Sequence, residues 1–230
     1  MILTVTPNPA VDKTYVVEGF DPRGIHTPRV ALTTPGGKGV NVARVCSVLG
    51  YPAVATGFLG GHNGSFILEQ LEQCGVIPDF VRVRGETRVC VEIVDSERGV
   101  HAKVNERGPH ISRTDVAHLE AKFHGWLSRA RIAVLAGGGP PGTPPDLYAR
   151  LVHRARESGV RVLLDASGEL LRAGVAAAPF MVKPNAEELS FLTGTPIRGP
   201  EDAAAAARAL LQSGVMVVAV SLGEQGAVIA

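Results

Sequence analysis

The chain alternates between short runs of consecutive apolar residues and longer stretches in which apolar residues recur every three or four positions. The first pattern is typical of strands buried on both faces of a sheet, and the second of helices. The predicted strands are residues 2–6, 53–58, 132–136, 160–165, 180–182 and 215–221. The predicted helices are residues 39–49, 65–74, 115–130, 145–158, 186–192 and 201–213. This order predicts an α/β fold with a mainly parallel sheet covered by helices on both faces.

Two of the predicted helices have clear apolar faces. In helix 115–130, one stripe combines Val116, Leu119, Phe123, Trp126, Leu127 and Ala130. In helix 39–49, one side carries Val42, Val45, Cys46 and Leu49. We expect both faces to pack against the sheet.

Four further segments have the mixed alternation of apolar and polar residues that is typical of strands. No helices lie between the strands that are expected to pair. The four segments are residues 13–18, 29–34, 87–94 and 100–104, so they lie within 13–34 and 87–105. Residues 95–99, with the sequence DSERG, are a good hairpin connection between the last two. We expect a small antiparallel sheet that acts as a lid or, because one of its faces is apolar, as the contact surface of a homodimer.

Composition narrows the class of protein. The 230 residues suit one large domain, and a net charge of +1 argues against nucleic-acid binding. The N-terminus has no basic segment of a signal peptide, and no apolar run approaches the length of a membrane span. The three scattered cysteines fit a reduced, cytoplasmic protein better than a disulfide framework.

The strongest chemical motif is the sequence PGGKGVN at residues 35–41. Its glycines let backbone N–H groups approach a ligand, the helix start adds partial positive charge, and Lys38 adds a full charge. These features predict a site for a phosphorylated or polyhydroxylated small molecule. The motif lacks the spacing of a Walker A loop.

The residues that follow the predicted strands extend this site. Ligands of open parallel sheets bind beyond the carboxyl ends of the strands. There the chain places Asp12, the glycines of residues 137–142, Asp165, Lys183, Asn185, Glu188 and Ser221.

Several motifs, in the same order along almost the whole chain, resemble those of the ribokinase-like carbohydrate kinases, most of all the phosphofructokinase B branch. They are TPNPAVD at 6–12, GGKGVN at 36–41, GETR at 85–88, KPNAEEL at 183–189 and SLGEQG at 221–226. The resemblance implies a three-layer α/β sandwich with a small β-sheet lid. It also implies that ATP and Mg²⁺ take part in phosphorylation of a sugar phosphate.

On the acceptor side, the resemblance implies that Asp12 binds sugar hydroxyls and that Arg88 binds a substrate phosphate. It also implies that the sugar-binding glycine motif consists of Gly37, Lys38 and Asn41. Ionised carboxylates accept strongly from hydroxyls, and guanidinium binds two phosphate oxygens at once. Each residue also has a purely structural interpretation. Asp12 could cap a turn, Lys38 could be a solvated lysine, and Arg88 could be an exposed cross-strand charge.

On the nucleotide side, the resemblance implies that Asn185 and Glu188 position Mg²⁺. It also implies that Lys183 and Asn185 contact the nucleotide phosphates. Ser221, Gly223 and Gly226 match a loop whose small residues let ATP lie flat. The alternatives are a helix capping box for Asn185 and Glu188, and a simple turn for residues 221–226.

Two features depart from the family pattern. Gly138 replaces the serine of the usual Gly-Ser-Leu-Pro loop. The family's catalytic aspartate belongs to a Gly-Ala-Gly-Asp segment that we expect beyond Ala230, so no catalytic residue is assigned and the chain is expected to be C-terminally incomplete and poorly active.

The favoured acceptor is fructose 1-phosphate, with tagatose 6-phosphate and fructose 6-phosphate as further candidates. One alternative is a catalytically inactive sugar-phosphate-binding module, or pseudokinase. Another is a dinucleotide-dependent oxidoreductase, which would need G-x-G-x-x-G after the first strand, where residues 7–9 read PNP instead.

Overall fold

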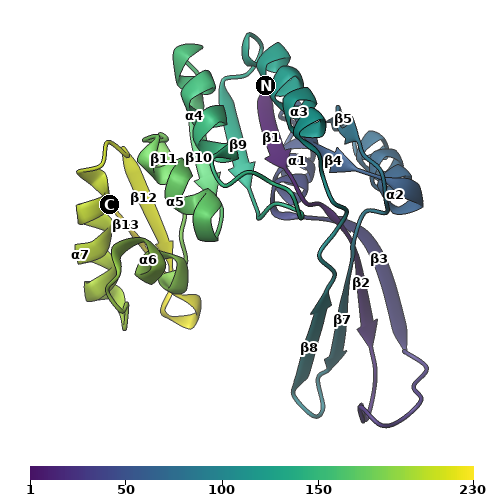
Figure 1. Cartoon of the computed structure of the whole chain (residues 1–230). Coiled ribbons are helices and arrows are strands. Elements are labelled where there is room, and N and C mark those ends of the chain that lie inside the picture. Colours follow the sequence, from purple (N-terminus) through teal and green to yellow (C-terminus); the bar gives the residue numbers. More distant parts are fainter.

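The computed structural model describes residues 1–230 and has a nine-stranded central sheet flanked by helices. Its strand order is β13-β12-β11-β10-β9-β1-β4-β5, with β6 also paired to β4 (Figure 1). All pairings are parallel except β12–β13, which is antiparallel. The predicted α/β class with a mainly parallel sheet is confirmed.

The strands of the central sheet are β1 (Ile2–Thr6), β4 (Ala53–Leu59), β5 (Ile77–Pro78), β6 (Val81–Arg82), β9 (Ile132–Ala136), β10 (Arg161–Asp165), β11 (Met181–Val182), β12 (Val217–Ser221) and β13 (Ala227–Ile229). The helices are α1 (Lys38–Val48), α2 (Gly61–Gln73), α3 (Arg113–Leu127), α4 (Leu147–Glu157), α5 (Gly168–Ala176), α6 (Ala186–Thr193) and α7 (Pro200–Leu211), with a 3-10 turn at Gly223–Gln225. No helix combines the length and the apolar character that crossing a membrane requires.

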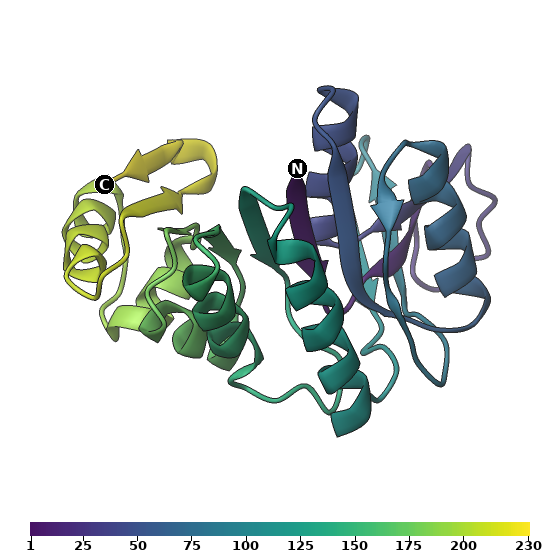
Figure 2. The ribbon, with the colours of Figure 1, turned by 90° about the horizontal axis from the view of Figure 1, so that it is seen from above.

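Two hydrophobic clusters lie on opposite faces of the sheet, with helices outside both (Figure 2). Strand β4 is buried throughout and contributes to both: Val54 belongs to the larger cluster, and Ala53 and Ala55 to the smaller. This follows from the alternation of side chains along a strand. The consecutive apolar residues of the sequence are therefore explained by burial on both faces.

Helix α1 does not pack with the face that its sequence indicates. Its buried residues are Gly39, Val40 and Ala43, whereas Val45 is 56% exposed and Leu49 is 66% exposed. The prediction of Val45 and Leu49 as inward residues is wrong, because the small residues allow the helix to lie close to β1. A Cβ on Gly39 would be 3.1 Å from the Val5 carbonyl oxygen.

A second, four-stranded sheet extends away from the body of the molecule (Figure 1). Its strands, in the order β3-β2-β7-β8, are β2 (Ala10–Val16), β3 (Val30–Gly36), β7 (Val89–Asp95) and β8 (Val100–Asn105). The β7–β8 hairpin is confirmed. The expectation of a wholly antiparallel sheet is wrong, because β2 and β7 are parallel. Both strands leave the body in the same direction and so run alongside each other.

Candidate functional site

The carboxyl ends of five neighbouring strands meet at one edge of the central sheet, because β1, β9, β10, β11 and β12 are parallel. The segments that follow them contain most of the residues selected from the sequence. The second sheet begins at the same edge, since β2 starts four residues after β1 ends. Strand topology therefore brings these residues to one side of the molecule.

The glycine loop before α1 is shaped by close backbone contacts. Gly37 has φ of 111°, and a Cβ there would lie 2.8 Å from Thr6 Cγ2. A Cβ on Gly36 would collide with the Asp12 carboxylate. Helix α1 has no side-chain cap and no acidic residue in its first turn. Its N-terminal N–H groups therefore remain available to an anionic or polyhydroxylated ligand.

One cavity of about 480 Å³ brings together the five residues predicted for the acceptor side. It is lined by Asp12, Gly37, Lys38, Asn41 and Arg88, which come from β2, α1 and the segment before β7. The polar residues on its second-sheet wall that the sequence analysis missed include Glu92, Lys103 and Asn105. Strand pairing could have indicated them, because Glu92 lies opposite Lys103, and Cys90 lies opposite Asn105.

Asp12 is the carboxylate of this cavity. Burial raises the pKa of Asp12, while the nearby cations Arg88, Lys103 and Arg44 act in the opposite direction and Glu92 adds to the rise. The net direction is upward, so this carboxyl group takes up a proton more readily than an exposed aspartate.

Arg88 is held by backbone carbonyl groups. Its Nε donates to the Asn8 carbonyl oxygen at 3.2 Å, and its Nη1 donates to the Glu106 carbonyl oxygen at 3.4 Å. No carboxylate forms an ion pair with it. Its charge is thus oriented but not neutralised, which suits an anionic ligand.

Lys38 and Lys183 converge on Asp165, which the sequence analysis placed at a strand end beside the site without giving it a ligand. Lys38 Nζ lies 2.7 Å from Asp165 Oδ1, and Lys183 Nζ lies 3.0 Å from Asp165 Oδ2. The Asp165 side chain is only 18% exposed. This carboxylate connects the glycine-loop lysine to the predicted nucleotide side of the site.

Asn185 and Glu188 form the capping box at the start of α6. Asn185 Oδ1 accepts from the Glu188 N–H at 2.8 Å, and Glu188 Oε2 accepts from the Asn185 N–H at 3.0 Å. The other oxygen, Glu188 Oε1, faces Lys38 Nζ at 3.9 Å. The capping interpretation of these residues is therefore correct, and one carboxylate oxygen remains for a further role.

These residues fit Mg²⁺ only together with a phosphorylated ligand. No three His, Cys, Asp or Glu side chains are grouped closely enough to hold a metal ion alone. Mg²⁺ is commonly held by one or two carboxylates together with water and substrate phosphates. Glu188 Oε1 and Asp165 provide such carboxylates at one edge of the sheet.

The remaining nucleotide-side residues lie around the end of β12. Ser221 forms a parallel bridge with Asn185, and its N–H donates to the Pro184 carbonyl oxygen at 3.1 Å. Gly223 and Gly226 have φ of 59° and 83° in the turn between β12 and β13. The structure thus places Ser221 beside Asn185, whereas the two glycines lie in an exposed turn. None of these residues lines the acceptor cavity.

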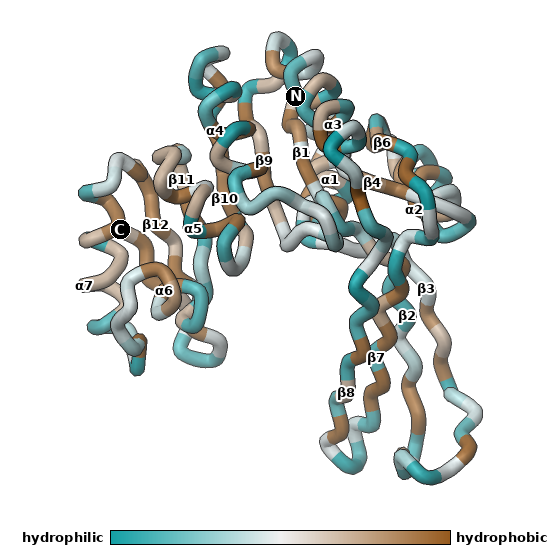
Figure 3. Tube along the Cα trace, in the orientation of Figure 1, coloured by the Kyte–Doolittle hydropathy of each residue, from teal (hydrophilic) through white to brown (hydrophobic).

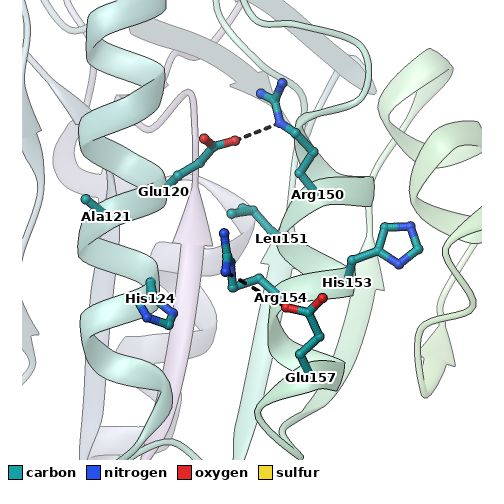
Figure 4. A pocket seen from close by; sticks show the side chains of 8 residues that line it. All are labelled: Glu120, Ala121, His124, Arg150, Leu151, His153, Arg154 and Glu157. Atoms are coloured by element: carbon teal, nitrogen blue, oxygen red, sulfur yellow. Dashed lines mark ion pairs between the residues drawn. The ribbon is translucent and has the colours of Figure 1, made fainter.

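Another cavity, of about 450 Å³, lies on the outer surface between α3 and α4, away from the strand ends (Figure 4). Its charged groups are largely paired with protein groups. Arg150 Nε lies 2.7 Å from Glu120 Oε1, and Arg150 Nη1 lies 3.2 Å from Asp146 Oδ2. His153 points away from α3 (Figure 4). This groove therefore offers little unpaired charge to a ligand.

Comparison with known proteins identifies the family of the chain. The sequence matches the pfkB family of carbohydrate kinases over residues 6–230. Escherichia coli phosphofructokinase-2, solved in complex with fructose-6-phosphate and in a tetrameric inhibited form, is 31% identical, with a TM-score of 0.91 over 100% of this chain and 76% of that chain. A possible 1-phosphofructokinase from Thermotoga maritima is 32% identical, with a TM-score of 0.92 over 100% of this chain and 74% of that chain.

The pfkB family match argues against the oxidoreductase alternative, because it accounts for residues 6–230, nearly the whole chain. The three-layer fold with a second small sheet is the fold of these relatives. The chain therefore belongs to the pfkB family of carbohydrate kinases, which are phosphotransferases.

Proposed function

We propose that the protein transfers the γ-phosphate of ATP to a hydroxyl of a phosphorylated ketohexose. Fructose 1-phosphate is the favoured acceptor, and tagatose 6-phosphate and fructose 6-phosphate are the other candidates. The observation that supports this proposal most strongly is that one cavity combines Asp12, the glycine loop, Asn41 and Arg88. It pairs a carboxylate for hydroxyl groups with a guanidinium for a phosphate.

In this proposal the acceptor lies between the second sheet and the glycine loop. Asp12 accepts hydrogen bonds from sugar hydroxyls, Asn41 contacts a further hydroxyl, and the Gly37 loop allows the sugar to approach the start of α1. Lys38 lies between this cavity and Asp165, where the acceptor hydroxyl and the nucleotide phosphates would meet. Phosphoryl transfer depends largely on such positioning and on neutralising charge.

ATP is proposed to bind along the ends of β11 and β12. Lys183 and Asn185 would contact its phosphates, and Ser221, Gly223 and Gly226 would border the nucleotide. Glu188, with Asn185, would hold Mg²⁺ through water and phosphate oxygens. When bound, this ion would neutralise charge on the transferred group.

No carboxylate among residues 1–230 is proposed as the catalytic base. Asp12 is assigned to sugar hydroxyls, Asp165 pairs with two lysines, and Glu188 takes part in a capping box. We therefore expect slow turnover from these residues alone. The second candidate function is a sugar-phosphate-binding module without catalysis, which the same observation favours.

The two functions are distinguished by ADP release in the presence of Mg²⁺ and each of the three phosphosugars. We expect release stimulated by a phosphosugar, strongest with fructose 1-phosphate, and not by unphosphorylated fructose. Saturable phosphosugar binding without stimulated ADP release would favour the binding module. Equal stimulation by fructose would contradict the phosphosugar assignment.

We also propose that the second sheet joins two copies of the chain. On the face opposite Asp12, apolar residues are neighbours in register: Tyr15 pairs with Ile93, and Val91 pairs with Val104. Val104 is 63% exposed, and hydrophobic segments extend along β2 and β7 well away from the body (Figure 3). A second copy would cover this surface. A cytoplasmic location remains a prediction.

A further inference from the structure

Arg44, within α1, is a half-buried cation that does not line the acceptor cavity. Its Nη1 donates to the Pro35 carbonyl oxygen at 3.2 Å, its Nε is buried without a hydrogen-bond partner, and no carboxylate forms an ion pair with it. The other cation of α1, Lys38, pairs with Asp165 at 2.7 Å. The Arg44 guanidinium is therefore fixed in place but not neutralised, and a partly buried charge of this kind is costly unless a nearby anion offsets it.

The nearby anion is Asp12. Pro35, whose carbonyl group Arg44 holds, lies at the end of β3 directly before Gly36. The Asp12 carboxylate occupies the space into which a Cβ on Gly36 would project. In the β2–β3 ladder, Asp12 lies opposite the neutral Thr34, one residue before Pro35. The end of β3 therefore has Arg44 on one of its carbonyl groups and the Asp12 carboxylate against its last residue.

Arg44 differs from the other charged groups that act on Asp12. Those groups are Arg88 before β7, Glu92 of β7 and Lys103 of β8, and all of them line the acceptor cavity. Lys103 is moreover paired with Glu92 at 3.0 Å, and Arg88 is open to a ligand. Arg44 acts on Asp12 from α1, outside the cavity, so its charge stays with the carboxylate when a ligand fills the cavity.

We propose that Arg44 is a positioning residue for the acceptor: it holds the end of β3 beneath the Asp12 carboxylate and gives that carboxylate a permanent positive neighbour. The inference rests on the proposed function and adds to it a residue that does not touch the substrate. The ionised carboxylate accepts more strongly from sugar hydroxyls than the protonated group does. Without the positive neighbour, Asp12 takes up a proton at higher pH, so Arg44 widens the pH range of acceptor binding.

The test is calorimetric titration of the full chain with fructose 1-phosphate from neutral to acidic pH, in the wild type, Arg44→Gln and Arg44→Lys. At neutral pH, Arg44→Gln should bind about three- to tenfold more weakly than the wild type. On acidification its affinity should start to fall at a higher pH, because Asp12 is protonated sooner. Arg44→Lys keeps the charge and should keep the wild-type pH profile. ATP affinity should change less than about twofold in both variants.

Two controls separate this role from a general effect on the fold. Arg208→Gln should match the wild type, because Arg208 lies in the last turn of α7 and is exposed without an ion pair. In an Asp12→Asn background, adding Arg44→Gln should not shift the pH profile, because no carboxylate remains at position 12. An arginine with a merely structural role would weaken binding equally in both backgrounds.

Circular dichroism verifies that each variant is folded, and Arg44→Met, a second neutral variant, decides if Arg44→Gln is not. Wild-type affinity and pH profile in the deciding variant, or an equally large shift of the profile in Arg44→Lys, would overturn the inference and leave the proposed function intact. Failure of both neutral variants to fold would also overturn it, because Arg44 would then be required for the fold itself. Absence of phosphosugar binding in the wild type would overturn both.

Discussion

At the scale of single residues, the site depends on which charges are neutralised and which are left unpaired. Asp165 neutralises Lys38 and Lys183, whereas Arg88 is oriented by carbonyl groups alone. The sequence could indicate Asp12, Lys38 and Arg88, because each lies in a recognisable motif. It could not indicate that Asp165 joins the two lysines, because that contact spans 127 residues.

Asp12 leads to a prediction about pH. Burial raises the pKa of its carboxyl group, and the protonated form accepts more weakly from sugar hydroxyls. Phosphosugar affinity should therefore fall as the pH is lowered through this raised pKa, starting at a higher pH than for an exposed aspartate. Titration calorimetry of the wild type and Asp12→Asn across acidic pH measures the effect. Identical pH profiles in the two proteins would contradict it.

At the scale of elements, strands with a strong pattern could be predicted and irregular elements could not. Strand β9 has the predicted bounds, Ile132–Ala136. Helix α5, which contains two glycines, was not predicted from the sequence. Gly174 is needed for packing, since a Cβ there would lie 2.7 Å from Leu164 Cδ2. Strands β5 and β6 have two residues each, too few to show a period.

Substitution by alanine should change the free energy of unfolding in opposite directions at two glycines. Gly37→Ala places a Cβ at a φ of 111° and against Thr6, and should destabilise the protein by about 1–3 kcal/mol. Gly125→Ala lies in the exposed interior of α3 with no atom within 4 Å, and should stabilise it by roughly 0.5–1 kcal/mol. Urea unfolding measures both changes, and equal effects would contradict this account of the loop before α1.

At the scale of the whole molecule, an α/β body carries a projecting sheet whose two faces differ (Figure 1). One face contributes Asp12 to the acceptor cavity, and the opposite face carries Tyr15 and Ile93. The sequence indicated the strands of this sheet but not the parallel pairing of β2 with β7. That pairing connects segments separated by the whole of α1, β4 and α2, so no local pattern predicts it.

From the apolar face of the projecting sheet we predict a dimer that one charged substitution disrupts. Ile93→Asp places a carboxylate in the apolar face and should convert a dimer to a monomer. Leu32→Asp is the matched control, because Leu32 is 54% exposed on the other face of the same sheet. Sedimentation velocity measures both. A monomeric wild type, or a dimer broken by Leu32→Asp but not by Ile93→Asp, would contradict the proposed interface.

The most direct test of the central claim is calorimetric titration of the wild-type chain and Asp12→Asn with fructose 1-phosphate at neutral pH. The account predicts saturable one-site binding by the wild type, weakened at least about tenfold in Asp12→Asn because an ionised acceptor of hydroxyl hydrogen bonds is lost. ATP affinity should be similar in both proteins. Failure of the wild type to bind any of the three phosphosugars, or unchanged affinity in Asp12→Asn, would contradict it.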